Sequence, residues 1–422
     1  MHLRAPCAPS PMPDRWLTAE RLRVYPKLAL GAYLLCAFGL VLASKGGVDP
    51  RGKPLGYDFL CFYAGGRMAL AGQAAAAYDL FQARQAQLAV FPSLGDVVFG
   101  WYYPPTYFLI QAPLALLPYW LAWTVWTAGT GALLTLAVRP ALREPGTTWL
   151  LLAAPVVLVN LFHGQNGFLM TALLVLGLRA RRRPALAGLC FGALTLKPQL
   201  GLLVPVVLAL TRQWRTILWA AATAAILVAL SVACFGLEPW RVFLTANASL
   251  LRALLERGIL PWPMMTSTFA AASMLGAPPV AAWALHAAWA VFVASVTAWL
   301  WWRRAPFAIA ASALMLGTLA ATPHGFYYDM VLALPPMWLL ARRARRTGWL
   351  PLEREAILAA YLAPALVGLA EALKVVPVMP AALGLLFVTV LRRYVAEEGR
   401  TGGTEPVGPD RPPALAVAGP AP

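Results

Sequence analysis

Long apolar segments separated by short basic clusters make up most of the sequence. Apolar runs of about 15–22 residues recur almost from end to end, which is the length that an α-helix needs to cross a bilayer. The strict alternation of apolar and polar positions that marks membrane-spanning β-strands is absent from the sequence. The pattern therefore predicts an all-α polytopic membrane protein.

The basic clusters orient the predicted helices, because Lys and Arg concentrate in the cytoplasmic segments of membrane proteins. Basic residues precede the first apolar run, Leu28–Ala43, and the pair Arg392-Arg393 follows the last run, so both termini are predicted to be cytoplasmic. Two cytoplasmic termini require an even number of crossings, and we expect about 12. Residues 45–102 then form a large first outer loop, in which amphipathic helices near 62–71 and 78–90 are expected to lie in the membrane interface.

Two segments depart from this simple alternation. Tyr103–Val138 contains two apolar pieces that divide near Leu117-Pro118, although the charge pattern requires an odd number of crossings there, so we expect one piece to be re-entrant. Pro184–Leu210 lies between two basic clusters. We therefore expect it to form a hairpin of two short helices with Lys197-Pro198 at its outer tip.

Three regions follow from this assignment. Residues 1–27 are predicted to be a cytoplasmic tail, and residues 28–395 the transmembrane domain. Residues 396–422 are rich in Gly and Pro and are predicted to be a disordered cytoplasmic tail. No cleavable signal peptide is predicted, because the first apolar run is followed by further spans.

Composition excludes several classes of protein. The chain is 60% hydrophobic and 12% charged, far from the roughly 25% charged residues of soluble domains. Its net charge of +17 comes from basic residues at the ends of apolar runs, so we interpret it as a topology signal and expect no nucleic-acid partner. The five cysteines form no CxxC pair, and the four histidines are dispersed, so no disulfide framework or metal site is predicted.

The polar residues that are hardest to explain on hydrophobic grounds fall at predicted outer loops or helix ends. These are Asp58, Gln165, Asn166, Lys197, His324, Asp329 and Lys374. Polar groups at membrane depth are costly and normally face a cavity or a partner. Their distribution predicts a single polar site that faces outward.

Several motifs occur in a family-specific order. They are Asp58-Phe59, Phe62-Tyr63, Tyr78-Asp79, Tyr102-Tyr103-Pro104-Pro105, Ala112–Pro118, Gly164-Gln165-Asn166, Leu196-Lys197-Pro198 and His324. In order and spacing, over about residues 28–395, the sequence resembles glycosyltransferase family 87. The resemblance implies the C-type membrane glycosyltransferase fold and a mannosyltransferase of the bacterial inner membrane that uses polyprenyl-phosphate mannose. It also implies that Asp58 is the catalytic base and that His324 belongs to the active site.

The chemistry of each candidate has a structural alternative. Because aromatic residues surround Asp58 in the sequence, its carboxyl group could have a raised pKa and act as a general base. Alternatively, it could cap the helix that follows. Gln165 and Asn166 could bind sugar hydroxyls or phosphate, or satisfy a helix end. Lys197 could bind the donor phosphate or extend to the membrane interface.

The aromatic residues Tyr57, Tyr327 and Tyr328 complete the predicted substrate site, since aromatic faces stack on sugar rings. His324 could instead be a loop histidine with ordinary partners. His163 and His286 are interpreted as structural. Asp58 and His324 are expected to flank one cavity that opens to the outer leaflet.

A polytopic transporter or lipid flippase is the alternative class of function. Transporters often show internal repeats and polar residues near the bilayer midplane, whereas this sequence shows no convincing repeat and its polar residues gather at one face. A nucleotide-sugar donor is disfavoured as well, because no outward acidic DxD cluster is present to hold a divalent metal with a pyrophosphate. The partners that the resemblance implies are a polyprenyl-phosphate sugar, which the absence of a DxD cluster also favours, a glycolipid or glycan acceptor and the bilayer, with no cofactor.

Overall fold

The computed structural model describes residues 18–368, 372 and 376–401 of the chain. In this part of the chain there are helices and three isolated β-bridges but no β-strand. In chain order the α-helices are α1 (Ala19–Ala43), α2 (Phe59–Leu70), α3 (Leu80–Val90), α4 (Phe108–Leu114), α5 (Tyr119–Leu142), α6 (Thr147–Leu152), α7 (Pro155–His163), α8 (Gly167–Arg179), α9 (Pro184–Gly192), α10 (Val204–Leu210), α11 (Trp214–Phe235), α12 (Glu238–Val242), α13 (Ala248–Glu256), α14 (Thr268–Met274), α15 (Pro279–Trp302), α16 (Phe307–Ala321), α17 (Leu334–Thr347), α18 (Glu353–Leu362) and α20 (Val378–Thr401). The all-α class predicted from the sequence is confirmed.

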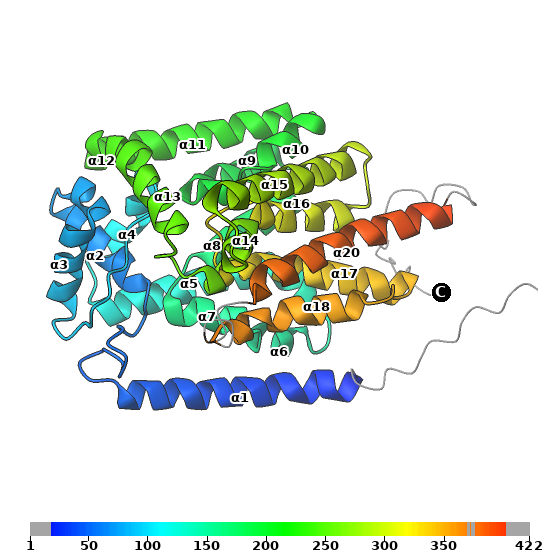
Figure 1. The fold of residues 1–422 in the computed structure, drawn as a ribbon. Helices are drawn as coiled ribbons and strands as arrows, with labels where there is room; N and C mark the ends of the chain where they lie inside the picture. Colours follow the sequence, from blue (N-terminus) through cyan, green and yellow to red (C-terminus); the bar gives the residue numbers. More distant parts are fainter. Residues whose placement is uncertain (1–17, 369–371, 373–375, 402–422) are drawn as a thin grey trace, which may run out of the picture.

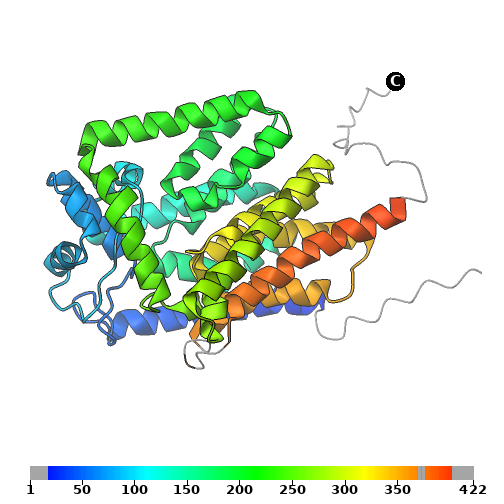
Figure 2. The same ribbon diagram turned by 45° about the horizontal axis from the view of Figure 1, so that its top comes forward.

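The long helices lie roughly side by side, and the short helices α2, α3, α12 and α13 gather at one end of them (Figures 1 and 2). Five of the described helices are long and apolar enough to cross a membrane, namely α1, α5, α11, α15 and α20. The number rises to six if the bent pair α7 and α8 is one span. The expected total of about 12 crossings stays a prediction.

Helix α1 begins at Ala19, nine residues before the apolar run that predicted it. Its first turn is capped by the Thr18 side chain, which accepts a hydrogen bond from the Arg21 backbone N–H at 3.2 Å. Arg21, Arg23 and Lys27, which precede the run, are therefore helical. Helix α20 likewise continues to Thr401, into the segment predicted to be a disordered tail. Lys374, which was predicted to lie at an outer loop or helix end, is outside the described residues, as are residues 1–17 and 402–422 of the predicted tails.

The two difficult segments become clear in the structure. Only α5 in the 103–138 region has spanning length, and the preceding apolar piece forms the seven-residue α4. Two short apolar segments, Pro184–Leu196 and Pro198–Leu210, meet at Lys197-Pro198, where the sequence predicted a break. Helices α2 and α3 form inside the predicted first loop. However, α2 is buried along nearly its whole length and does not present one apolar face to an interface, because α3, α4 and nearby aromatic side chains surround it.

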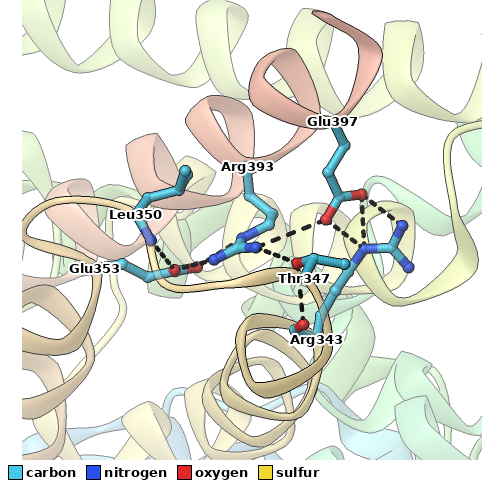
Figure 3. A network of polar contacts seen from close by, with 6 residues as sticks. All are labelled: Arg343, Thr347, Leu350, Glu353, Arg393 and Glu397. Carbon is cyan, nitrogen blue, oxygen red and sulfur yellow. Dashed lines mark hydrogen bonds and ion pairs between the residues drawn. The ribbon is translucent and has the colours of Figure 1, made fainter. Parts of the chain in front are cut away.

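The basic clusters meet at the other end of the helices. Here Arg303 pairs with Glu398 at 2.9 Å, and Arg343 binds Glu397 through Nε and Nη2 of its guanidinium group. Figure 3 shows the centre of this network, where the fully buried Arg393 of α20 binds the fully buried Glu353 at the start of α18. Since the clusters predicted to be cytoplasmic converge at one end, the predicted alternation is consistent with the fold. The cytoplasmic location of this end stays a prediction.

Helices α9 and α11 approach each other through small residues. Gly188 and Gly192 of α9 form a GxxxG pattern, which allows two helix backbones to come close. A Cβ atom at Gly188 would lie 2.8 Å from the Ala220 nitrogen and 2.9 Å from the Thr216 carbonyl oxygen, so it would press on backbone that has little room to move.

Gly188→Ala is therefore expected to destabilise the protein by about 1–3 kcal/mol, the usual cost of overpacking. The melting temperature of the protein in detergent measures this effect. Gly129→Ala in α5 is the matched control, because a Cβ atom there has nothing within 4 Å. Equal melting temperatures for the two variants would contradict the proposed close contact.

Candidate active site

Asp58 stands directly before α2, but it does not cap this helix, because its side chain makes no capping hydrogen bond. Its Oδ2 atom instead lies 3.2 Å from Nδ1 of His163 and accepts a hydrogen bond from Nε2 of Gln165 at 2.9 Å. The side chain keeps 24% of its surface exposed. The carboxylate is thus fixed by two partners and still accessible to a substrate.

A sharp turn in the chain places both partners. Helix α7 ends at His163, Gly164 adopts the left-handed conformation with φ 56°, and α8 leaves at 119°. The indole N–H of Trp126 holds this turn by donating to the Gly164 carbonyl at 2.7 Å. A Cβ atom at position 164 would collide with Phe59, so only glycine fits there. The turn brings His163 and Gln165 to the same carboxylate.

His163 connects Asp58 to Tyr327, the first residue of η7 (Tyr327–Ala333). The Tyr327 hydroxyl lies 2.8 Å from Nε2 of His163, opposite the Nδ1 atom that faces Asp58. One neutral tautomer satisfies both contacts, with Nδ1–H donating to the carboxylate and Nε2 accepting from the phenol. The result is a hydrogen-bonded chain of three side chains, Asp58, His163 and Tyr327.

Tyr57 packs against this chain. Its ring stacks on the His163 imidazole, with ring centres 4.7 Å apart, and its hydroxyl donates to Oδ2 of Asp49 at 3.0 Å. The Tyr57 backbone lies in the left-handed region with φ 43°, a conformation that is uncommon for tyrosine and occurs most often at functional sites. Burial and the bond to Asp49 raise the pKa of Tyr57 to about 12. The phenol therefore stays protonated at neutral pH.

The pKa of Asp58 is lower than that of an ordinary carboxyl group, contrary to the raised value expected from its aromatic surroundings. Burial alone would raise the pKa. The hydrogen bond with His163, the charge that this imidazole carries when it is protonated, the hydrogen bond from Gln165 and the charge of Lys53 together lower it more. The carboxyl group is therefore ionised at neutral pH. As an anion it can accept a proton, but with less driving force than a carboxylate of raised pKa.

A second pair lies beside the first cluster. The Lys197 ammonium is 2.6 Å from Oδ1 of Asp329 and donates to Oδ1 of Asn166 at 3.3 Å. Both charged side chains are almost completely buried, at 4% and 0% exposure. Asp329 also accepts from the Phe326 backbone N–H at 3.1 Å. Lys197 therefore does not extend to an interface, and its charge is matched inside the protein.

Gln165 and Asn166 join the two clusters. The Gln165 carbonyl oxygen accepts from the Tyr103 hydroxyl at 3.1 Å, while its amide nitrogen binds Asp58. Asn166 contacts Lys197, whose ammonium also lies 5.2 Å from the Tyr328 ring centre. These contacts connect seven of the predicted site residues, namely Tyr57, Asp58, Gln165, Asn166, Lys197, Tyr327 and Tyr328.

His324 takes part in none of these contacts. It sits in the turn between α16 and η7, and the titratable group that influences it is His286. Burial first, and then His286, lower the pKa of His324 to about 4, so the imidazole is neutral at physiological pH. The histidine that contacts Asp58 is His163, which the sequence analysis interpreted as structural. Its position next to Gly164 at a predicted outer helix junction is the signal that could have identified it.

No three His, Cys, Asp or Glu side chains come together as possible metal ligands among the residues that the structure describes. The groups available for chemistry are therefore a carboxylate, a histidine, an ammonium, amides and phenols. This set suits proton transfer and the binding of hydroxyl and phosphate groups.

Comparison with known proteins identifies the family. Residues 101–323, more than half of the chain, match the model of glycosyltransferase family 87. The chain belongs to glycosyltransferase family 87. No curated protein and no solved structure matches it. Together with the helices of spanning length, family 87 membership indicates a membrane glycosyltransferase.

The segment that matches family 87 contains His163, Gln165, Asn166 and Lys197, but it ends before Tyr327 and begins after Asp58. The structure supplies the link between these parts, because the turn at Gly164 holds Asp58 on one side and η7 on the other. The site is thus assembled from the family 87 segment and from residues on both sides of it.

Proposed function

We propose that this glycosyltransferase moves a hexose from a polyprenyl-phosphate donor to a hydroxyl group of a glycolipid or glycan acceptor. The proposed hexose is mannose. The reaction takes place at the outer side of a bacterial inner membrane. The observation that supports this proposal most is the Asp58 carboxylate, accessible to a substrate and held by His163 and Gln165. A carboxylate in this setting is suited to act as general base on an acceptor hydroxyl.

The chemical step is a single displacement. The acceptor oxygen attacks the anomeric carbon of the donor sugar while Asp58 takes the hydroxyl proton. The bond from the anomeric carbon to the phosphate oxygen breaks, and its electron pair leaves with the polyprenyl phosphate. Attack from the face opposite the leaving group inverts the configuration at the anomeric carbon.

His163 and Tyr327 have supporting roles in this mechanism. His163 orients the carboxylate through Nδ1–H and stabilises its negative charge before the reaction. When the other oxygen of Asp58 becomes protonated, the hydrogen bond from Nδ1–H to Oδ2 keeps the carboxyl group in place, and Tyr327 fixes the imidazole ring from the other side. Gln165 holds the same oxygen of Asp58 and leaves the other oxygen to the acceptor.

Lys197 is the proposed cation for the departing phosphate, which develops negative charge as the bond breaks. In the free protein the ammonium is paired with Asp329, so the phosphate would share the ammonium with that carboxylate. Lys53, whose charge acts on Asp58, is a second cation at this end of the protein. The rings of Tyr57, Tyr327 and Tyr328 are proposed to contact the sugar.

The proposal is tested with purified protein in liposomes, radiolabelled polyprenyl-phosphate mannose and a set of glycolipid acceptors. We expect a mannosylated lipid product with wild-type protein and at least about 100-fold slower formation of this product with Asp58→Asn. Polyprenyl-phosphate glucose in the same assay tests the sugar. Transfer from a nucleotide-linked mannose, dependent on a divalent metal and independent of the lipid donor, would overturn the proposed donor.

His163→Asn is expected to move the acidic limb of the kcat/KM profile to higher pH and to lower the plateau. Asp58 works as a base only when ionised, so activity falls as the pH drops through its pKa. His163 is the largest of the interactions that lower this pKa, so its removal raises the pKa of Asp58. The measurement is the pH dependence of kcat/KM from about pH 3 to 8, a range that begins below the ordinary aspartate pKa of about 3.9.

His324→Asn is assayed in parallel, because the resemblance assigned the active-site histidine to that position. A shifted acidic limb in His324→Asn, with none in His163→Asn, would show that the partner of Asp58 during the reaction is His324.

A further inference from the structure

An apolar cavity of about 490 Å³ lies at the basic end of the protein, away from the candidate active site. The ends of α5 and α8, the start of α16 and the helices α17 and α18 enclose it, and Leu22 of α1 borders it. Its walls are formed by apolar side chains such as Ala141, Met315 and Ile357. A chain of methylene groups would fit these walls.

Arginine side chains line the same cavity. Four of its lining residues are Arg179, Arg342, Arg345 and Arg354, and none of the described lining residues is acidic. Glu144, outside the lining, pairs with both Arg342 and Arg345, so one carboxylate faces two guanidinium groups. Arg342 and Arg345 keep 43% and 53% of their side-chain surface exposed. The cavity thus combines an apolar interior with an accessible positive rim.

Tryptophans mark the depth of this rim. Trp338 and Trp349 line the cavity, and each ring lies beside an arginine of the rim. The Arg342 guanidinium carbon is 5.3 Å from the Trp338 ring centre, and that of Arg354 is 4.6 Å from the Trp349 ring centre. Tryptophan concentrates where the hydrocarbon of a bilayer meets the headgroups. The arginines are therefore at the level of lipid phosphates, and the apolar cavity is at the level of the acyl chains.

We propose that this cavity binds an anionic phospholipid of the adjacent leaflet, with its acyl chain against the apolar walls and its phosphate at Arg342 and Arg345. Basic pockets between membrane helices bind anionic headgroups in this way. The bound lipid would join α17 and α18 to the ends of α5 and α8, and the opposite end of α8 begins next to the turn that contains His163. This site takes a membrane lipid, and it is independent of the sugar donor.

The test uses the full-length protein, purified in detergent and stripped of lipid. Phosphatidylglycerol and phosphatidylcholine with identical acyl chains are titrated, with binding followed by native mass spectrometry and by the melting temperature. We expect phosphatidylglycerol to bind at least about tenfold more tightly than phosphatidylcholine, because each arginine near an anionic headgroup favours binding. Inorganic phosphate alone should bind much more weakly, since it lacks the chains that the cavity accepts.

Two variants with opposite expected effects keep the proposal testable even if one folds poorly. Arg342→Gln/Arg345→Gln should weaken phosphatidylglycerol binding by about tenfold or more. Glu144→Gln removes the competing carboxylate and should strengthen it. The matched control is Arg212→Gln/Arg215→Gln, which removes the same charge from two exposed arginines outside the cavity and should leave the affinity unchanged.

Equal affinity for the two phospholipids would overturn the proposal, and so would equal losses in the test and control double variants. Tighter binding of polyprenyl phosphate than of phosphatidylglycerol, sensitive to Arg342→Gln/Arg345→Gln, would also overturn it and would assign the cavity to the carrier lipid.

Discussion

Asp58→Asn is expected to lower the turnover number by about 10²–10⁴-fold, the usual contribution of a general base. Asparagine has the size and shape of aspartate and can still accept the hydrogen bond from Gln165 Nε2. It has no basic oxygen that can take a proton from an acceptor hydroxyl. The loss should therefore appear in kcat, with little change in the binding of the lipid donor.

The turnover of both Asp58→Asn and a control is measured with polyprenyl-phosphate mannose in liposomes. Asp79→Asn is the matched control, because Asp79 lies in the same region of the chain and has a structural role. Its side chain caps α3 by accepting from the Gln82 backbone N–H at 2.8 Å. Asparagine also caps helices well, so Asp79→Asn should keep its activity. Wild-type turnover in a correctly folded Asp58→Asn protein would refute the assignment of Asp58 as the base.

The sequence predicted those parts of the fold that depend on local composition. The apolar run Leu28–Ala43 marked α1, and the Lys197-Pro198 pair marked a break because proline removes a backbone donor within an apolar stretch. Helix ends were less predictable. Helix α1 begins nine residues before the apolar run, because Thr18 caps a first turn that the hydrophobic pattern does not reveal.

The burial of α2 could not be predicted from its own sequence either. Its sequence, with polar and apolar positions mixed, was interpreted as amphipathic, but whether such a helix lies at an interface or inside a fold depends on what packs against it. The residues that bury it, among them Trp101 and Tyr107, come from a segment about 40 residues later in the chain.

The contacts of the site depended on long-range geometry. Asp58 and His163 are 105 positions apart, and Lys197 and Asp329 are 132 positions apart. Hydrophobic pattern and charge topology placed these residues at the same end but could not pair them. The turn at Gly164 decides that His163 faces Asp58. From the sequence alone, His163 and His324 were two histidines in outer segments, with nothing local to distinguish which one meets the carboxylate.

The pairing with Asp329 changes what a Lys197 variant can show. Lys197→Met leaves the Asp329 carboxylate buried at 0% exposure without its ammonium partner, and breaking a buried ion pair in this way typically costs about 3–5 kcal/mol. We expect a large drop in the melting temperature of Lys197→Met. Lost activity in this single variant would therefore not distinguish phosphate binding from unfolding.

The double variant Lys197→Met/Asp329→Asn separates these effects. With both charges removed, no unpaired charge is left buried at positions 197 and 329. The side-chain oxygen of the introduced asparagine can still accept from the Phe326 backbone N–H, so most of the lost stability should return. If Lys197 also binds the donor phosphate, the stable double variant should still bind polyprenyl-phosphate mannose at least about tenfold more weakly, as expected from the loss of a charge-assisted hydrogen bond. Wild-type donor affinity in the double variant would show instead that the ion pair only holds η7 against the Lys197-Pro198 break, and that another cation, such as Lys53, serves the departing phosphate.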